Sequence, residues 1–261
     1  MIYYITAIIL AAVLGLCVGS FLNVCVYRIP NGISLSKPAS HCPNCKNPIR
    51  WYDNIPVLSF LILGGKCRHC KQKISPRYML VELANGILWV GAVLLFWKTE
   101  PVYAVLAALA SSVALCVFCT DLEYMMIPDR YSLILAGLGL VAMFFDPATV
   151  WWSHLVGGAV AAGMFLLVYY LAMLIYKKEA LGGGDVKFSA AAGLFLGWQK
   201  FLFMLLVAAL VASVVLLAVR LAKKQEQDKE YPFAPFLSAG FVLSLAVGAQ
   251  VIAWYVGLLT F

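Results

Sequence analysis

The sequence predicts an all-α, polytopic membrane protein with about eight transmembrane helices and one sizeable loop domain outside the bilayer. Of its 261 residues, 64% are hydrophobic and only 12% are charged, and the mean hydropathy is +0.92. This composition excludes an ordinary soluble globular protein. The formal net charge of +7 would suit nucleic acid, but the basic residues lie in short loops between apolar runs, as at a cytoplasmic membrane surface. The expected surrounding is therefore a lipid bilayer, and no nucleic-acid partner is expected.

Eight apolar runs approach the roughly 20 residues that a helix needs to cross a bilayer. The chain starts Met1-Ile2-Tyr3-Tyr4, without the basic region of a cleavable signal peptide, so the first run is expected to remain as a span. The fourth and sixth runs are short, and the sixth would also suit a segment that enters the bilayer and returns. The candidate spans are residues 2–27, 78–97, 102–120, 131–145, 149–176, 186–197, 201–221 and 235–260.

The distribution of lysine and arginine predicts the orientation of these spans. With the N-terminus outside, the inner loops hold 17 of the 19 basic residues, and only Lys98 and Lys200 lie outside. If the sixth run returned instead of crossing, the division would be 14 against 5. The positive-inside rule therefore favours eight crossings and a cytoplasmic location for the inner loops. These loops are residues 28–77, 121–130, 177–187 and 220–234.

The first inner loop, residues 28–77, carries two Cys-x-x-Cys pairs separated by 21 residues. This spacing is typical of a zinc ribbon or knuckle, in which four thiolates form a closed tetrahedral site. Two disulfides are the alternative, but they require an oxidising compartment, and the charge distribution places this loop in the cytoplasm. A closed four-sulfur site leaves no position for catalysis, so the predicted zinc would serve to fold the loop. The predicted ligands are Cys42, Cys45, Cys67 and Cys70.

Two acidic residues at membrane boundaries are the candidate catalytic groups. Asp185 follows three glycines in the stretch Leu181 to Lys187, and Asp121 follows the third apolar run. Alternatively, Asp185 caps the next helix, and the acids near Asp121, including Glu123 and Asp129, form a solvated turn. Two spans separate Asp121 from Asp185, so both are expected on the cytoplasmic face, where packing can bring them together.

Two adjacent carboxylates share a proton, because both cannot ionise cheaply. The ionised group can then take a proton from water while the protonated one polarises a carbonyl, which is hydrolysis of an amide. The same two acids would also serve as relay groups in a proton-coupled transporter. A third hypothesis is a non-enzymatic membrane scaffold whose zinc-bound loop binds a partner.

Motifs along most of the chain resemble the type IV prepilin peptidases, which are membrane aspartic proteases of the GxGD class. Their order and spacing together are highly specific. They include Gly19 to Val24, Tyr27 to Pro30, the paired cysteines, Ile74 to Tyr78, Val81-Glu82, Asp121 with Ile127 to Asp129, Gly182 to Lys187, and Pro232 to Leu237. The chain departs from the family pattern at Met79, where a proline is expected, and at Glu123, where many relatives have an aspartate.

The resemblance implies that Asp121 and Asp185 are the catalytic pair, with Gly182, Gly184 and Lys187 as the supporting motif. It implies a bacterial inner-membrane enzyme that cuts the basic leader of a prepilin or pseudopilin after a glycine, on the cytoplasmic side. Relatives with the cysteine loop also methylate the new N-terminus, so S-adenosylmethionine is implied as methyl donor. We therefore expect residues 1–100 to form the putative methyltransferase region and residues 101–261 the peptidase core.

Two features of the first loop remain open. It contains nine basic residues and only one acidic residue, Asp53, so we expect its positive surface to bind anionic lipid headgroups. Glu82, near the start of the second span, is either a leader contact, a methyltransferase residue, or one half of a structural pair with a nearby Arg or Lys.

Overall fold

The computed structural model describes residues 1–177, 182–223 and 231–259, and the chain divides into two compact units, Met1–Cys116 and Val117–Phe261. The division falls inside a helix, α4 (Pro101–Tyr124). Leu181 of the glycine motif and Lys178, Lys224 and Lys229 of the charge distribution lie outside the described residues, as does the predicted end of the last span at residue 260.

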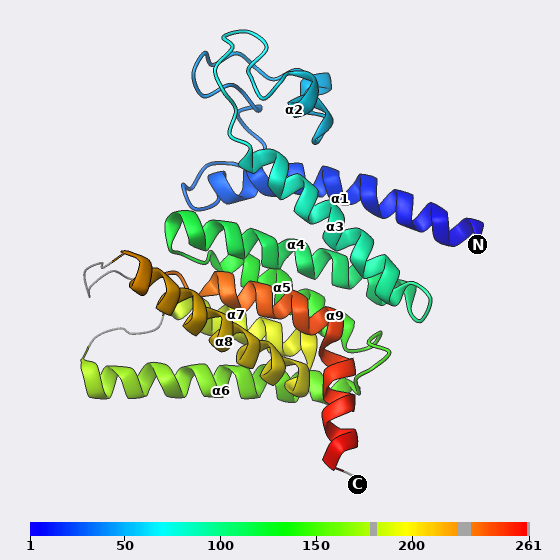
Figure 1. The fold of residues 1–261 in the computed structure, drawn as a ribbon, viewed down its shortest axis with the longest axis vertical. Coiled ribbons are helices and arrows are strands. Elements are labelled where there is room, and N and C mark those ends of the chain that lie inside the picture. The colour runs from blue at the N-terminus through cyan, green and yellow to red at the C-terminus, as the bar shows by residue number, and fades with distance from the viewer. Residues whose placement is uncertain (178–181, 224–230, 260–261) are drawn as a thin grey trace. The chain divides into compact units, whose positions relative to one another are not determined.

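The regular elements of the described residues are helices, which confirms the all-α prediction (Figure 1). Two isolated β-bridges occur in the first loop, His41 with Pro48 and Lys66 with Lys73. The remaining elements are α1 (Ile2–Arg28), η1 (Trp51–Asn54), α2 (Leu58–Ile62), α3 (Arg77–Phe96), α5 (Asp129–Ala142), α6 (Trp151–Tyr176), α7 (Gly183–Leu196), α8 (Trp198–Lys223) and α9 (Ala234–Leu259).

Six of the described helices are long and apolar enough to cross a membrane, so the predicted number of eight is wrong. The helices that fall short are α5 and α7, each of 14 residues. At 1.5 Å per residue, such a helix rises about 21 Å, whereas the hydrocarbon core is about 30 Å thick. The spanning helices are α1, α3, α4, α6, α8 and α9.

Unit 1 is built on the packing of α1 against α3 (Figure 1). A buried polar network ties these helices to the part of α4 that lies in this unit. Asn85 Nδ2 donates to the carbonyl oxygen of Gly15 at 2.7 Å, and Ser112 Oγ donates to Asn85 Oδ1 at 2.8 Å. Because water is absent from a bilayer core, such groups must find partners within the protein.

Glu82 has a backbone partner in the structure, and it is not the arginine or lysine of the structural alternative. Its buried carboxylate accepts a hydrogen bond from the backbone N–H of Val57, with an Oε2-to-nitrogen distance of 2.7 Å. Val57 is the residue that precedes α2, so this bond connects the start of α3 to the first loop. A carboxylate paired with an N–H group satisfies a donor that would otherwise be costly to bury.

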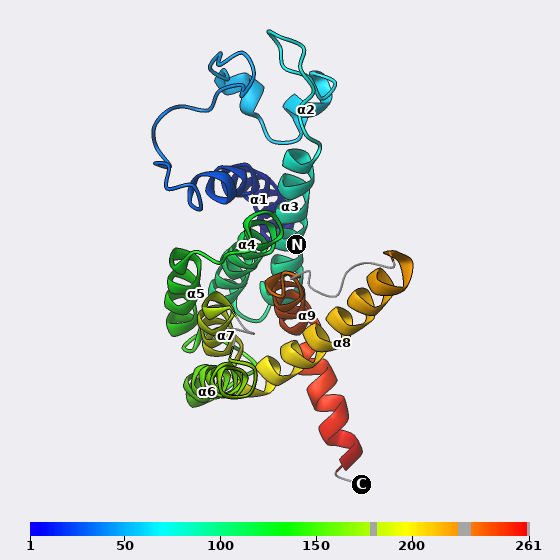
Figure 2. The ribbon, with the colours of Figure 1, turned by 90° about the vertical axis from the view of Figure 1, so that its left-hand side faces the viewer.

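Unit 2 is organised around α7, which packs against α5, α6, α8 and α9 (Figure 2). Its side chains Phe188, Phe195 and Leu196 are fully buried. Close packing against α6 depends on Gly157 and Gly193, since a Cβ atom on either residue would overlap the backbone of the other helix. Small residues permit such close approach between membrane helices, and they explain why this short helix lies inside the unit.

A buried ion pair links the α5–α6 connection to the start of α8. Lys200 Nζ donates to Asp146 Oδ2 at 2.8 Å, and His154 Nε2 lies 3.6 Å from the same oxygen. The side chains of Lys200 and Asp146 are 9% and 1% exposed. A buried lysine is tolerated when it is paired in this way.

Candidate active site and metal centre

Asp121 lies in the last turn of α4 and is held by the first residue of α9. Its side chain is buried, and Oδ2 accepts a hydrogen bond from the backbone N–H of Ala234 at 3.1 Å. The first N–H groups of a helix have no partner within that helix. One of these donors in α9 is therefore used to hold a carboxylate, and the partial positive charge at the helix N-terminus stabilises negative charge on that oxygen.

Asp185 is the third residue of α7, so the interpretation of this residue as a helix cap is wrong. Gly182 occupies the N-cap position, and no side chain caps the helix. Asp185 Oδ1 is buried and has no hydrogen-bond partner among the described residues. Burial and, secondarily, the nearby charge of Asp121 raise the pKa of the Asp185 carboxyl to about 7.

The segments that carry the two acids are in contact at two further positions. A Cβ atom built on Gly184 would lie 2.9 Å from Cβ of Ile127, so these residues already touch closely. Lys187 Nζ donates to Asp129 Oδ1 at 2.7 Å. The fold thus brings the 121–130 segment against the start of α7, although the two are distant in sequence.

The remaining acids of the 121–130 segment differ in their surroundings from Asp121. The side chain of Asp129 is 63% exposed and forms its ion pair with Lys187 at the surface. Glu123 is also exposed. Only Asp121 combines burial with electrostatic proximity to Asp185, and two such acids can share one proton and work as a base and an acid.

Sequence reasoning missed the contributions of Ala234 and Ile127 to this arrangement. Ala234 acts through its backbone N–H, which every residue except proline possesses, so its side chain carries no signal. Ile127 acts through its shape against a glycine. The Pro232 to Leu237 motif pointed to the start of α9 only through the family resemblance, without indicating what that segment contacts.

The first loop brings the four predicted cysteine ligands together. Their sulfur atoms all lie within 4.8 Å of one another, with Cys42 Sγ 3.8 Å from Cys70 Sγ and Cys45 Sγ 4.0 Å from Cys67 Sγ. All eight cysteines of the chain are free, so the disulfide alternative is wrong.

Each Cys-x-x-Cys pair forms the same local turn. The N–H of Cys42 donates to the carbonyl of Asn47, and the N–H of Cys67 donates to that of Gln72. The lysine after each pair, Lys46 or Lys71, has a left-handed backbone with φ near +60° and donates its N–H back to the first cysteine of the pair. The turns project two sulfur atoms each toward a common point.

Hydrogen bonds within the loop favour a thiolate at Cys42 and Cys70. At Cys45, against a backbone hydrogen bond from Asn47, burial and the neighbouring thiols raise the pKa of the thiol to about 11. The backbone N–H of Gln72 and then the amide of Asn44 lower the pKa of the Cys70 thiol to about 6. Sulfur ligands at about 2.3 Å from a tetrahedral zinc ion are separated by about 3.8 Å from one another. The observed sulfur separations therefore fit a four-cysteine zinc site.

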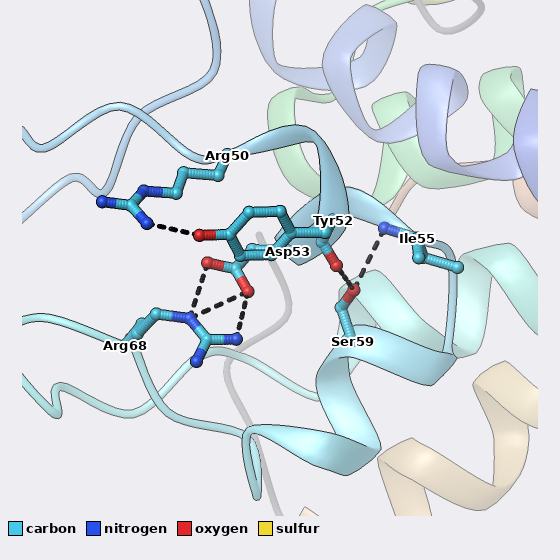
Figure 3. A network of polar contacts seen from close by, with 6 residues as sticks. All are labelled: Arg50, Tyr52, Asp53, Ile55, Ser59 and Arg68. Carbon is cyan, nitrogen blue, oxygen red and sulfur yellow. Dashed lines mark hydrogen bonds and ion pairs between the residues drawn. The ribbon is translucent and has the colours of Figure 1, made fainter.

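A polar network braces the segment between the two cysteine pairs (Figure 3). Arg68 lies within the second cysteine pair, and its Nε and Nη2 donate to the two carboxylate oxygens of Asp53 at 2.6 to 3.0 Å. Arg50 donates to the hydroxyl of Tyr52, and Ser59 Oγ donates to the carbonyl of Tyr52 at 2.9 Å. This bidentate geometry fixes η1 and α2 relative to the cysteine cluster.

Comparisons with known proteins place these sites in a family context. Residues 13–97 match the profile of the bacterial peptidase A24 N-terminal domain, and residues 108–217 match that of the type IV leader peptidase family. A "prepilin leader peptidase/N-methyltransferase" of Burkholderia pseudomallei is 34% identical, with 91% of this chain and 84% of the relative covered.

The chain belongs to the type IV leader peptidase family. Relatives with the same printed name from Klebsiella pneumoniae and Aeromonas hydrophila are 45% and 32% identical. The comparison covers 71% of this chain and 83% of the Klebsiella protein, and 92% of this chain and 91% of the Aeromonas protein. No solved structure matches the chain. The predicted family resemblance is confirmed.

The two matched regions of this leader peptidase divide the candidate sites between them. The N-terminal match contains the four-cysteine cluster, and the match to the type IV leader peptidase family contains Asp121 and Asp185. The six spanning helices and the family indicate a multi-pass inner-membrane protein.

Proposed function

We propose that this member of the type IV leader peptidase family cleaves the leader of prepilins or pseudopilins and methylates the new N-terminus. The printed names of relatives that match over most of both chains support the two activities. The observation that carries the peptidase proposal is the approach of Asp121 and Asp185, which are 64 residues apart in sequence. One buried oxygen of Asp185 has no partner among the residues that the structure describes. Neither the transporter nor the scaffold alternative is favoured by the family.

The different surroundings of the two acids assign their roles. Asp121 accepts an N–H bond from Ala234 at the N-terminus of α9, and this donor stabilises negative charge on the Asp121 oxygen. Within the described part of the chain Asp185 has no donor on Oδ1, and its pKa is raised to about 7, so it holds the shared proton near neutral pH. Asp121 is therefore the base, and Asp185 is the acid.

Hydrolysis then follows from these protonation states. Asp121 removes a proton from water as the water oxygen attacks the scissile carbonyl carbon, while the Asp185 proton is donated to the carbonyl oxygen. When the carbon–nitrogen bond breaks, the leaving amine takes its proton from Asp121, and the re-formed carbonyl returns a proton to Asp185. One water molecule is consumed, and the pair regains its starting state.

Zinc is the metal that we propose for Cys42, Cys45, Cys67 and Cys70. Four sulfur ligands would complete the tetrahedral coordination of zinc and leave no position for a water ligand, so the ion would hold the loop together rather than take part in hydrolysis. S-adenosylmethionine would supply the methyl group for the new N-terminal amine. We also propose that the N-terminus lies outside and the acid pair at the cytoplasmic face. The basic loop of residues 28–77 favours the cytoplasm, α3 and α4 return the chain to that face at Asp121, and Asp185 lies near Asp121.

The test is prepilin cleavage by the detergent-purified enzyme with single substitutions. Asp121→Asn and Asp185→Asn should each reduce cleavage by at least about a thousandfold, because each removes one half of the acid–base pair. Asp129→Asn is the matched control, since Asp129 is an exposed acid of the same segment, and it should stay within about fivefold of wild type. Wild-type cleavage by either of the first two variants would refute the proposal.

The same variants separate the alternatives. A transporter would lose proton-coupled flux in vesicles, and a scaffold would lose neither flux nor cleavage. Mass measurement of the mature product, with and without S-adenosylmethionine, reports the methylation in the same reaction.

A further inference from the structure

A cavity of about 380 Å³ lies in unit 1 between α1 and the first loop, and none of the four clustered cysteines lines it. Its α1 wall is formed by residues spaced three, four, seven and eleven positions after Cys17, which places them on one face of the helix. Residues 35–40 and 54–56 of the loop form the other walls. Small-molecule sites in proteins typically occupy about 300 to 1,000 Å³.

Arg28 lines this cavity as a buried cation. Its guanidinium donates to the backbone carbonyls of Ser34 at 2.9 Å, Leu35 at 3.2 Å and Pro38 at 2.7 Å. The residue is 7% exposed, and no acidic side chain pairs with it among the described residues. A guanidinium has five N–H donors, so two remain after these three bonds. A buried cation with donors to spare is suited to a carboxylate.

The other cavity walls combine hydroxyl groups with apolar surfaces. Ser20, Ser36 and Ser40 supply hydroxyls, and Asn54 supplies an amide. Phe21 and neighbouring aliphatic and proline residues supply apolar walls. This lining suits a ligand with an aromatic ring, several hydroxyl groups and one carboxylate, whereas a lipid acyl chain would leave the hydroxyls and the guanidinium unused.

We propose that this cavity is the binding site for the methyl donor, S-adenosylmethionine. The donor is a nucleoside joined to an amino acid, so Arg28 would hold its carboxylate, the serines and Asn54 would bond its hydroxyl and amino groups, and the apolar walls would contact its base. This inference rests on the proposed N-methylation. In that reaction the lone pair of the neutral N-terminal amine forms a bond to the methyl carbon, the carbon–sulfur electron pair stays on sulfur, and the product ammonium releases a proton to water.

Equilibrium binding of radiolabelled S-adenosylmethionine to the purified full-length enzyme tests this site directly. Ser20→Leu and Ser36→Leu each place an apolar side chain into the cavity and should weaken binding by at least about tenfold, or about 1.4 kcal/mol. Arg28→Gln should weaken it similarly. Thr6→Leu is the matched control, because Thr6 is an exposed hydroxyl residue of α1 that bonds only to the carbonyl of Ile2 and does not line the cavity. It should bind the donor as wild type does.

Prepilin cleavage is measured on the same preparations, because it reports a folded enzyme independently of the donor. We expect the Ser20 and Ser36 variants to cleave within about twofold of wild type while they lose donor binding and methylation together. Wild-type donor affinity in both serine variants would overturn the assigned site. Absence of donor binding by the wild type would overturn the site together with the proposed methylation. The peptidase proposal would stand or fall independently, because it is tested by cleavage with the Asp121→Asn and Asp185→Asn variants.

Discussion

The contact between Gly184 and Ile127 makes a quantitative prediction about the acid pair. In Gly184→Ala, the new Cβ would lie 2.9 Å from Ile127 Cβ, whereas ordinary contact begins at 3.4 Å, so one segment must move by about 0.5 Å. Gly184 immediately precedes Asp185, and its backbone is not left-handed, so the substitution imposes no backbone strain. The displacement is therefore expected to change the distance between the Asp121 and Asp185 carboxyl groups.

The expected loss follows from the sensitivity of catalysis to placement. A misplacement of about 1 Å costs on the order of a hundredfold in rate, and overpacking costs about 1 to 3 kcal/mol. We expect kcat/KM for prepilin cleavage to fall by about 10- to 100-fold in Gly184→Ala. The assay is a time course of cleavage by purified enzyme at substrate concentrations below KM.

Gly183→Ala is the matched control, because a Cβ on Gly183 would have no atom of the described residues within 4 Å. It should cleave within about twofold of wild type. Ile127→Gly removes the atoms that the new methyl group would meet, so the Gly184→Ala Ile127→Gly pair should lose less activity than the two single losses combined. Equal activity of the Gly183 and Gly184 variants would refute the steric link between this contact and the acid pair.

Two further predictions concern protons and metal. The pKa of Asp185 is raised to about 7, and its protonated form is the active one, so kcat/KM for cleavage should fall as the pH rises through about 7. A carboxyl group of ordinary pKa would instead lose its proton well below about pH 6. A pH profile of cleavage that stays flat from about pH 6 to 9 would contradict this assignment. Metal analysis of the purified enzyme should find about one zinc per chain, and Cys45→Ser should lower that content and increase proteolysis of the 28–77 loop; an unchanged loop in a zinc-free protein would contradict a structural role for the metal.

The cysteine cluster was predictable from sequence because its geometry is largely local. Each Cys-x-x-Cys-Lys segment folds into its own turn, and two such turns side by side bring four sulfur atoms together. The number of spanning helices was less accessible. Hydropathy reports the apolar character of α5 and α7, but the 14-residue length of each helix is set by where neighbouring helices and turns end it.

The sequence by itself determined the membrane class, the helical architecture, the four clustered cysteines and two candidate acids, because these depend on composition and on short-range spacing. Only the tertiary structure decided that Asp121 and Asp185 are neighbours, that Ala234 donates to one of them, and that Gly184 lies against Ile127. These contacts join segments up to 113 residues apart. They depend on how whole helices pack, and the energy of packing is shared over many side chains rather than recorded in any one motif.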